Sequence, residues 1–125
     1  MKKNIWISVF TIMMVMIALF LIKWTQSRVS PFSLKDYQQC IEQFPSEEKV
    51  GPIETGKDAK RAAENIWSKT WGNDIKSKKP YKVYYDGENC AWLVCGTMPI
   101  GMPGGVPYII IQKDTGVILA LWHEK

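Results

Sequence analysis

The side chains that could perform chemistry are few, and their spacing matches no catalytic or metal-binding pattern. His123 is the single histidine of the 125-residue chain, which excludes a metal site built from several histidines. The cysteines Cys40, Cys90 and Cys95 lack the C-x-x-C spacing of a zinc site. A cysteine–histidine nucleophile pair would need Cys90 or Cys95 beside His123, and no local signature indicates one. We therefore predict no catalytic residue, no metal, no cofactor, and a protein that is not an enzyme.

The glycine-rich stretch Thr97–Ile111, TMPIGMPGGVPYIII, raises the question of phosphate binding. A phosphate loop leads into a helix whose N-terminal amides hold the anion, and it usually carries Gly-Lys-Ser/Thr. Here Gly104 and Gly105 lead into a branched apolar run, and no lysine follows before Lys113. The stretch therefore predicts a connection between two strands. Loops at a sheet edge are frequent contact surfaces, so partner contact and simple chain reversal both stay open.

The positive charge of the chain is concentrated at its N-terminus. The formal net charge is +4, and residues 1–28 contain four Lys or Arg and no acid. The remainder contains 12 Lys or Arg against 12 Asp or Glu. A neutral domain lacks the electrostatic field that phosphate backbones require, so we predict no binding to nucleic acid.

An uncharged run, Ile5–Ile22, predicts that residues 1–28 are a membrane anchor. As a helix its 18 residues would span about 27 Å, against roughly 30 Å of bilayer hydrocarbon. Trp6 and Trp24 flank the run, where interfacial aromatic residues sit. The alternative is a cleaved signal peptide, for which the two leading lysines would supply the basic region.

The compartment of the C-terminal part determines the expected state of the cysteines. A short N-terminal tail normally stays inside, which would export the C-terminal part, although the flanking positive charges nearly balance. An oxidising compartment would permit one disulfide. Cys90 and Cys95 would face opposite sides of a continuous strand, so Cys40 with one of them is the geometrically open pairing. Three buried reduced thiols are the alternative.

The hydrophobic pattern predicts two helices followed by four strands. Apolar residues recur at helical spacing over residues 33–44 and 55–72, with a polar linker between them. Alternation then predicts strands over residues 81–85, 90–97, 106–112 and 117–123. This order is typical of an α+β fold with an antiparallel sheet. We expect residues 29–54 to form a short helix and linker, and residues 55–125 to form the main domain.

The chain over residues 55–125 resembles a known family. The residues that carry the resemblance are Lys79-Pro80-Tyr81, Trp92 and Val94 before Gly96, Gly104-Gly105, Ile109, Ile111, Lys113, Thr115-Gly116 and His123, after an Ala-rich helix ending near Trp71-Gly72. They make the chain similar to the immunity proteins with the nuclear-transport-factor-2-like fold (the YbbC/YhhH type). The N-terminal anchor and the pair Cys90 and Cys95 depart from the family pattern.

This resemblance implies a fold and a partner, and the anchor adds an expected location. The fold would be cone-shaped, with the two short helices packed on a four-stranded antiparallel sheet. The protein would be a bacterial antitoxin that binds and neutralises a cognate protein toxin in competition between bacteria. With the anchor, we expect a single-pass protein of the bacterial inner membrane whose C-terminal domain is periplasmic.

Three classes of function remain in competition. The leading one is a binding module that blocks a toxin, and the others are a small ligand-binding or enzymatic domain using the cavity of the fold, and an anchored accessory protein without a toxin partner. For the leading class, we expect Met98, Ile100 and Met102 to supply adaptable apolar contacts. Tyr84 and Trp92 are candidate aromatic anchors, since Tyr and Trp dominate interface hot spots, and a core position is the alternative for each.

Overall fold

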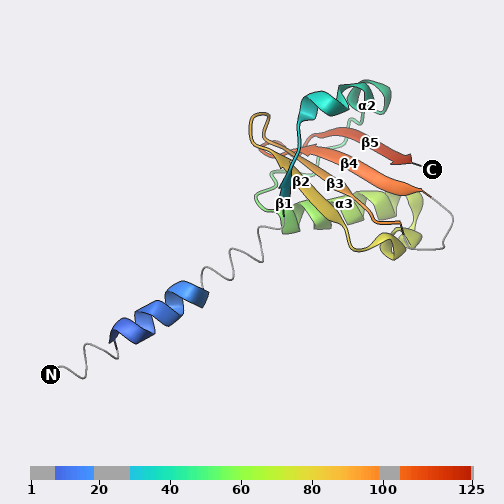
Figure 1. Ribbon diagram of the computed structural model, residues 1–125. Helices are drawn as coiled ribbons and strands as arrows, with labels where there is room; N and C mark the ends of the chain where they lie inside the picture. Colours follow the sequence, from blue (N-terminus) through green and yellow to red (C-terminus); the bar gives the residue numbers. More distant parts are fainter. Residues whose placement is uncertain (1–7, 19–28, 99–104, 125) are drawn as a thin grey trace.

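The computed structural model describes residues 8–18, 29–98 and 105–124. Residues 8–18 are helical. Residues 29–98 and 105–124 form a sheet with helical segments on both of its faces (Figure 1).

The sheet has five strands in the order β1-β2-β3-β4-β5. Their bounds are β1 Val29–Pro31, β2 Lys82–Asp86, β3 Ala91–Cys95, β4 Val106–Gln112 and β5 Ile118–Glu124. Strands β2 to β5 are the four predicted strands, and neighbouring ones pair in antiparallel fashion. Strand β1 pairs in parallel with β2, so the sheet is mixed and the prediction of four antiparallel strands missed one. The extra strand comes from the segment expected to hold only a helix and a linker.

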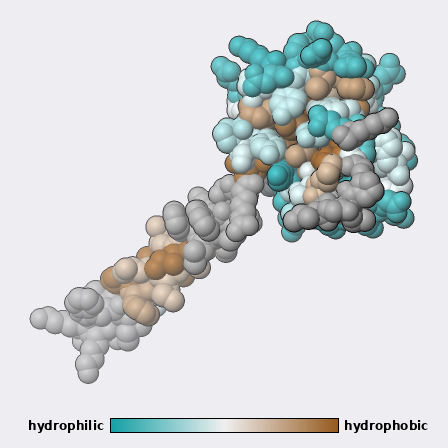
Figure 2. Space-filling view, turned by 45° about the vertical axis from the view of Figure 1, so that its right-hand side comes forward, coloured by the Kyte–Doolittle hydropathy of each residue, from teal (hydrophilic) through white to brown (hydrophobic). Residues whose placement is uncertain are grey.

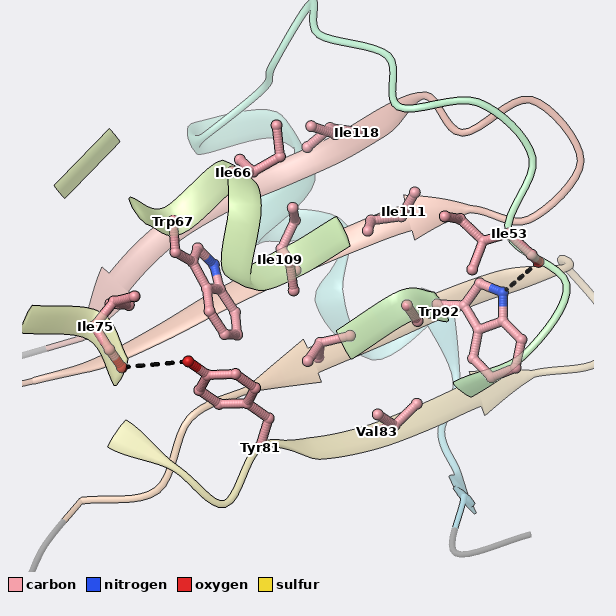
Figure 3. Close-up of a cluster of buried hydrophobic side chains, with 13 residues drawn as sticks. Ile53, Ile66, Trp67, Ile75, Tyr81, Val83, Trp92, Ile109, Ile111 and Ile118 are labelled. Atoms are coloured by element: carbon pink, nitrogen blue, oxygen red, sulfur yellow. Dashed lines mark hydrogen bonds between the residues drawn. The ribbon is translucent and has the colours of Figure 1, made fainter. Parts of the chain in front are cut away.

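One face of the sheet is covered by helix α3, Gly56–Trp71, and the 3₁₀ helix η2, Asn73–Lys78. Helix α3 begins where predicted, because the Thr55 hydroxyl accepts a hydrogen bond from the Asp58 amide at 3.2 Å. It ends at Gly72, whose φ of 91° suits glycine. The core beneath α3 is shown in Figure 3, and it comprises Ile53, Ala59, Ala63, Ile66, Trp67, Ile75, Tyr81, Val83, Trp92, Val94, Ile109, Ile111 and Ile118.

The opposite face is partly covered by the 3₁₀ helix η1, Leu34–Tyr37, and the short helix α2, Gln38–Gln43. Together they correspond to the predicted helix over residues 33–44. A second, smaller core lies beneath them, formed by Ala91, Leu93, Ile110, Ala120 and Trp122. The two predicted helical regions therefore pack on opposite faces of the sheet.

The polar segment between α2 and α3 is bonded to the sheet through its backbone. The Ile118 amide donates to the Glu48 carbonyl at 3.0 Å, and the Leu121 amide donates to the Phe44 carbonyl at 3.1 Å. The Val50 amide donates to the Gly116 carbonyl at 2.9 Å. This segment therefore runs along β5 and is part of the fold rather than a free linker.

The predicted anchor is only partly within the described residues. Among the helices of residues 8–18, 29–98 and 105–124, none combines the length and the apolar character needed to cross a membrane. Trp6, Trp24 and both ends of the run Ile5–Ile22 lie outside those ranges.

Candidate partner-binding face

The strand register brings chemically distinctive side chains together on the face of the sheet opposite α3. Across the sheet, Lys82 pairs with Cys95, Cys95 with Tyr108, and Tyr108 with Trp122. Tyr84 lies two residues further along β2 on the same face. Tyr37, at the end of η1, packs against this face from above. We call the set Tyr37, Tyr84, Cys95, Tyr108 and Trp122 the tyrosine face.

The tyrosine face is organised around Trp122. The ring of Tyr108 stacks on Trp122 at 5.0 Å between centroids and 7° between planes. Phe44 and Tyr37 also contact Trp122, each with centroids 6.2 Å apart. Trp122 is itself buried, whereas Tyr37, Tyr84 and Tyr108 are half-buried. The three tyrosines are therefore held by packing while part of each remains accessible.

Burial raises the pKa of three groups on this face, Tyr37, Cys95 and Tyr108. Burial, with the nearby Glu124 carboxylate and the Cys95 thiol, raises the pKa of Tyr108 to about 12. Burial and the neighbouring Cys95 and Tyr84 raise the pKa of Tyr37. Burial also raises the pKa of the Cys95 thiol. Because a nucleophilic cysteine requires the thiolate, this face suits aromatic contact and hydrogen bonding rather than covalent chemistry.

The residues predicted to bind a partner differ in their positions and in their exposure. Tyr84 lies on the tyrosine face, and Met98 is 45% exposed just beyond the end of β3. Trp92 is only 6% exposed, and its Nε1 donates a hydrogen bond to the Ile53 carbonyl at 3.0 Å (Figure 3). Trp92 is therefore a core residue, which was the alternative interpretation, and it offers no surface to a partner. Ile100 and Met102 lie outside the described residues.

Two residues of the tyrosine face, Tyr37 and Tyr108, were not among the predicted contacts. Alternation along residues 106–112 places Tyr108 on one sheet face, but which face stays accessible depends on the position of α2. Tyr37 lies within the predicted helix over residues 33–44, and helical spacing alone gave no sign that its ring remains half-exposed.

All three cysteines carry free thiols, and no disulfide joins them. Cys40 packs with α2 on the tyrosine-face side, whereas Cys90 lies in the turn between β2 and β3. Cys95 is buried at the other end of β3. The structure therefore contains neither a Cys40–Cys90 nor a Cys40–Cys95 disulfide, and of the three thiols only that of Cys95 is buried.

His123 does not form a catalytic pair with a cysteine. It is exposed and packs edge-on against Trp71 of α3, with centroids 5.4 Å apart. Cys95 belongs to the opposite face of the sheet, and Cys90 lies at the opposite end of β3. Within the described ranges no group of three or more His, Cys, Asp or Glu could hold a metal ion.

Helix α3 followed by the antiparallel strands β2 to β5 is the order of elements expected from the resemblance in sequence. Residues 58–125 match the family of NTF2 fold immunity proteins, and the match covers more than half of the sequence. The chain belongs to the NTF2 fold immunity protein family. The matched region begins within α3, so β1 and α2 precede it. No curated protein and no solved structure matches the chain significantly.

Proposed function

We propose that this protein is a membrane-anchored, non-enzymatic immunity protein that binds and neutralises a cognate protein toxin through its tyrosine face. Membership of the immunity family is the observation that carries the function. In this proposal residues 1–28 are the anchor, residues 29–54 form the short helix and linker, and residues 55–125 are the immunity domain.

The composition of the tyrosine face supports its role as the docking surface. Tyrosine rings give large contact area with few rotatable bonds, and their hydroxyls can satisfy polar groups of a partner. Packing against Trp122 fixes the rings of Tyr37 and Tyr108 before a partner arrives, so little side-chain entropy is lost on binding. Met98, which is exposed beyond the end of β3, would add an adaptable apolar contact. The contacts expected of Ile100 and Met102 remain predictions.

The helical residues 8–18 support membrane anchoring. Their apolar side chains are each 47–67% exposed in the structure: Val9, Phe10, Ile12, Met13, Met14, Val15, Met16 and Ile17. Figure 2 shows this segment as tan to brown, in contrast to the largely teal rim of the domain. A helix that is apolar on all sides is stable when surrounded by other apolar groups, and lipid would provide them. We place the domain on the periplasmic side of the bacterial inner membrane.

The function is tested by survival of cells that express a candidate toxin, for which the product of the gene next to that of this protein is the first choice. Wild-type protein should protect these cells, and the double variant Tyr84→Ala/Met98→Asp should protect poorly. Loss of an aromatic anchor and desolvation of a new carboxylate should weaken toxin binding by at least about tenfold. Trp71→Asp is the matched control, because Trp71 is 39% exposed but lies on the α3 side of the sheet.

Each outcome of the survival assay has a defined meaning when melting curves establish that the variants fold. Absence of protection by the wild-type protein would refute the assignment as immunity protein for that toxin. Full protection by Tyr84→Ala/Met98→Asp, with protection lost in Trp71→Asp, would move the docking surface to the α3 side. Release of the wild-type protein from membranes by alkaline carbonate would refute the anchor.

A further inference from the structure

The charges of the folded domain are segregated although their sum over residues 29–125 is zero. Residues 56–79, which contain α3 and η2, carry seven Lys or Arg against three Asp or Glu. The remainder, residues 29–55 and 80–125, carries five Lys or Arg against nine Asp or Glu. The α3 side is therefore basic and the rest of the domain acidic, which a balanced total conceals.

An open groove of about 620 Å³ lies on this basic side. It is lined by Lys57, Lys60, Arg61 and Glu64 of α3 and by the segment Lys79–Tyr81, which leads into β2. Pro80 gives the groove exposed apolar surface beside its charged side chains, whereas Tyr81 is buried. We call this feature the basic groove.

The cations at one end of the basic groove are not neutralised by the chain. Glu64 pairs with Lys79 at 3.4 Å, and the Tyr81 hydroxyl, together with Lys79, lowers the pKa of the Glu64 carboxyl. Arg61 has only a long, exposed contact with Asp58 at 3.9 Å. Lys57 and Lys60 have no acidic partner among the described residues. Carboxylates of a ligand could pair with Lys57 and Lys60, whereas Lys79 is already paired with Glu64.

The charge and the limited extent of the basic groove favour a short, protruding protein segment. The acidic remainder of the domain opposes an extended polyanion such as a nucleic acid. The chain's own residues 19–28 do not complement the groove, because Lys23 and Arg28 are their only charges. An acidic peptide loop with an apolar side chain can place carboxylates against Lys57 and Lys60 and its apolar group on the exposed Pro80.

We propose that the basic groove between α3 and Lys79–Tyr81 is a second docking site, which receives an acidic, protruding segment of a protein partner. The site lies on the opposite side of the sheet from the tyrosine face, so it goes beyond the proposed toxin contact. Two partners, or two parts of one large partner, can occupy the two sites together.

The experiment measures binding of a synthetic probe to the full chain in neutral detergent micelles. The probe is a fluorescent ten-residue peptide of glutamates with one central leucine, and its affinity is followed by anisotropy. Lys57→Gln/Lys60→Gln should weaken binding by at least about tenfold, since each cation near an anionic ligand contributes a several-fold factor. Lys35→Gln/Lys49→Gln is the matched control, because it removes the same charge from exposed lysines outside the groove and should change affinity less than about twofold. Replacing the leucine of the peptide with serine should also weaken binding.

Three results would overturn the proposal. An equal loss of peptide affinity in both double variants would mean that binding depends on the net charge of the protein and not on the groove. Displacement of the peptide by an equal concentration of phosphatidylglycerol in the micelles would assign the cations to a membrane surface. Self-association abolished by Lys57→Gln/Lys60→Gln would assign the groove to a second copy of this chain. The substitutions in the tyrosine face should leave peptide binding unchanged, so this test and the survival assay can fail independently.

Discussion

Two buried tryptophans offer a direct test of how the core is stabilised. Trp92 and Trp67 lie in the same core beneath α3 and are 6% and 0% exposed. The Nε1 of Trp92 donates to the Ile53 carbonyl at 3.0 Å, whereas the Nε1 of Trp67 has no partner among the described residues. Figure 3 shows both rings, with the hydrogen bond drawn only for Trp92. The same substitution by phenylalanine should therefore have different consequences at the two positions.

The expected magnitudes follow from what each substitution removes. The smaller ring loses buried contacts at either site, on the order of 1–2 kcal/mol. Trp92→Phe also leaves the Ile53 carbonyl without its donor, which costs about 1–3 kcal/mol more. Trp67→Phe instead removes a buried donor without an acceptor, which offsets the lost contacts by about 1–3 kcal/mol. We expect Trp92→Phe to lose about 3 kcal/mol and Trp67→Phe to be close to neutral.

Thermal and denaturant unfolding of the full chain in micelles, followed by circular dichroism, measures the difference. For a domain of this size, 3 kcal/mol corresponds to melting temperatures about 12–24 °C apart. Free energies of unfolding within about 0.5 kcal/mol of each other would refute the role given to the Trp92 hydrogen bond. A larger loss in Trp67→Phe would show that ring volume outweighs hydrogen bonding in this core.

Further predictions concern a close approach, a buried carboxylate and a helix cap. Gly105→Ala should destabilise the domain by about 3 kcal/mol or more, since its Cβ would lie 1.3 Å from the Glu124 carbonyl oxygen, whereas Gly87→Ala should be nearly neutral in the same melting assay. Hydrogen bonds from the Asn89 side chain and the Leu34 amide lower the pKa of Asp86 from 3.8 to about 2. The ionised carboxylate therefore stabilises the folded state fully above pH 4, and this contribution is lost as the pH falls toward 2. In Asp86→Asn, the free energy of unfolding should fall less steeply as the pH is lowered from 4 to 2. An unchanged pH dependence would contradict this role. Thr55→Ala should lower the free energy of unfolding by about 1 kcal/mol, because the α3 cap is lost; an unchanged value would mean that the cap contributes nothing.

The sequence predicted well the elements whose pattern is local. Helical spacing over residues 55–72 placed α3, and alternation placed β2 to β5. Strand β1 was missed, because three residues ending in Pro31 show no alternation, and its parallel pairing with β2 joins residues more than fifty positions apart. Such a pairing is determined by tertiary packing, which single-sequence patterns do not record.

The candidate sites were harder to predict than the fold. Tyr84 and Trp92 looked equivalent as aromatic residues on strands, but α3 buries Trp92 while α2 leaves Tyr84 half-exposed. Nothing in the sequence indicated the basic groove, because positive and negative charges balance over residues 29–125. Only the fold shows that Lys57, Lys60 and Lys79 gather on one side.

The segment that follows α2 has a consequence for the behaviour of the sheet at high concentration. Strand β5 is an edge, and an uncovered edge presents amides and carbonyls to any other extended chain. Here the carbonyls of Phe44 and Glu48 accept hydrogen bonds from Leu121 and Ile118. At the other edge, β1 is three residues long and ends in Pro31. Both edges are thereby protected from strand-to-strand polymerisation, and cleavage within residues 45–54 should convert a stable protein into one that aggregates.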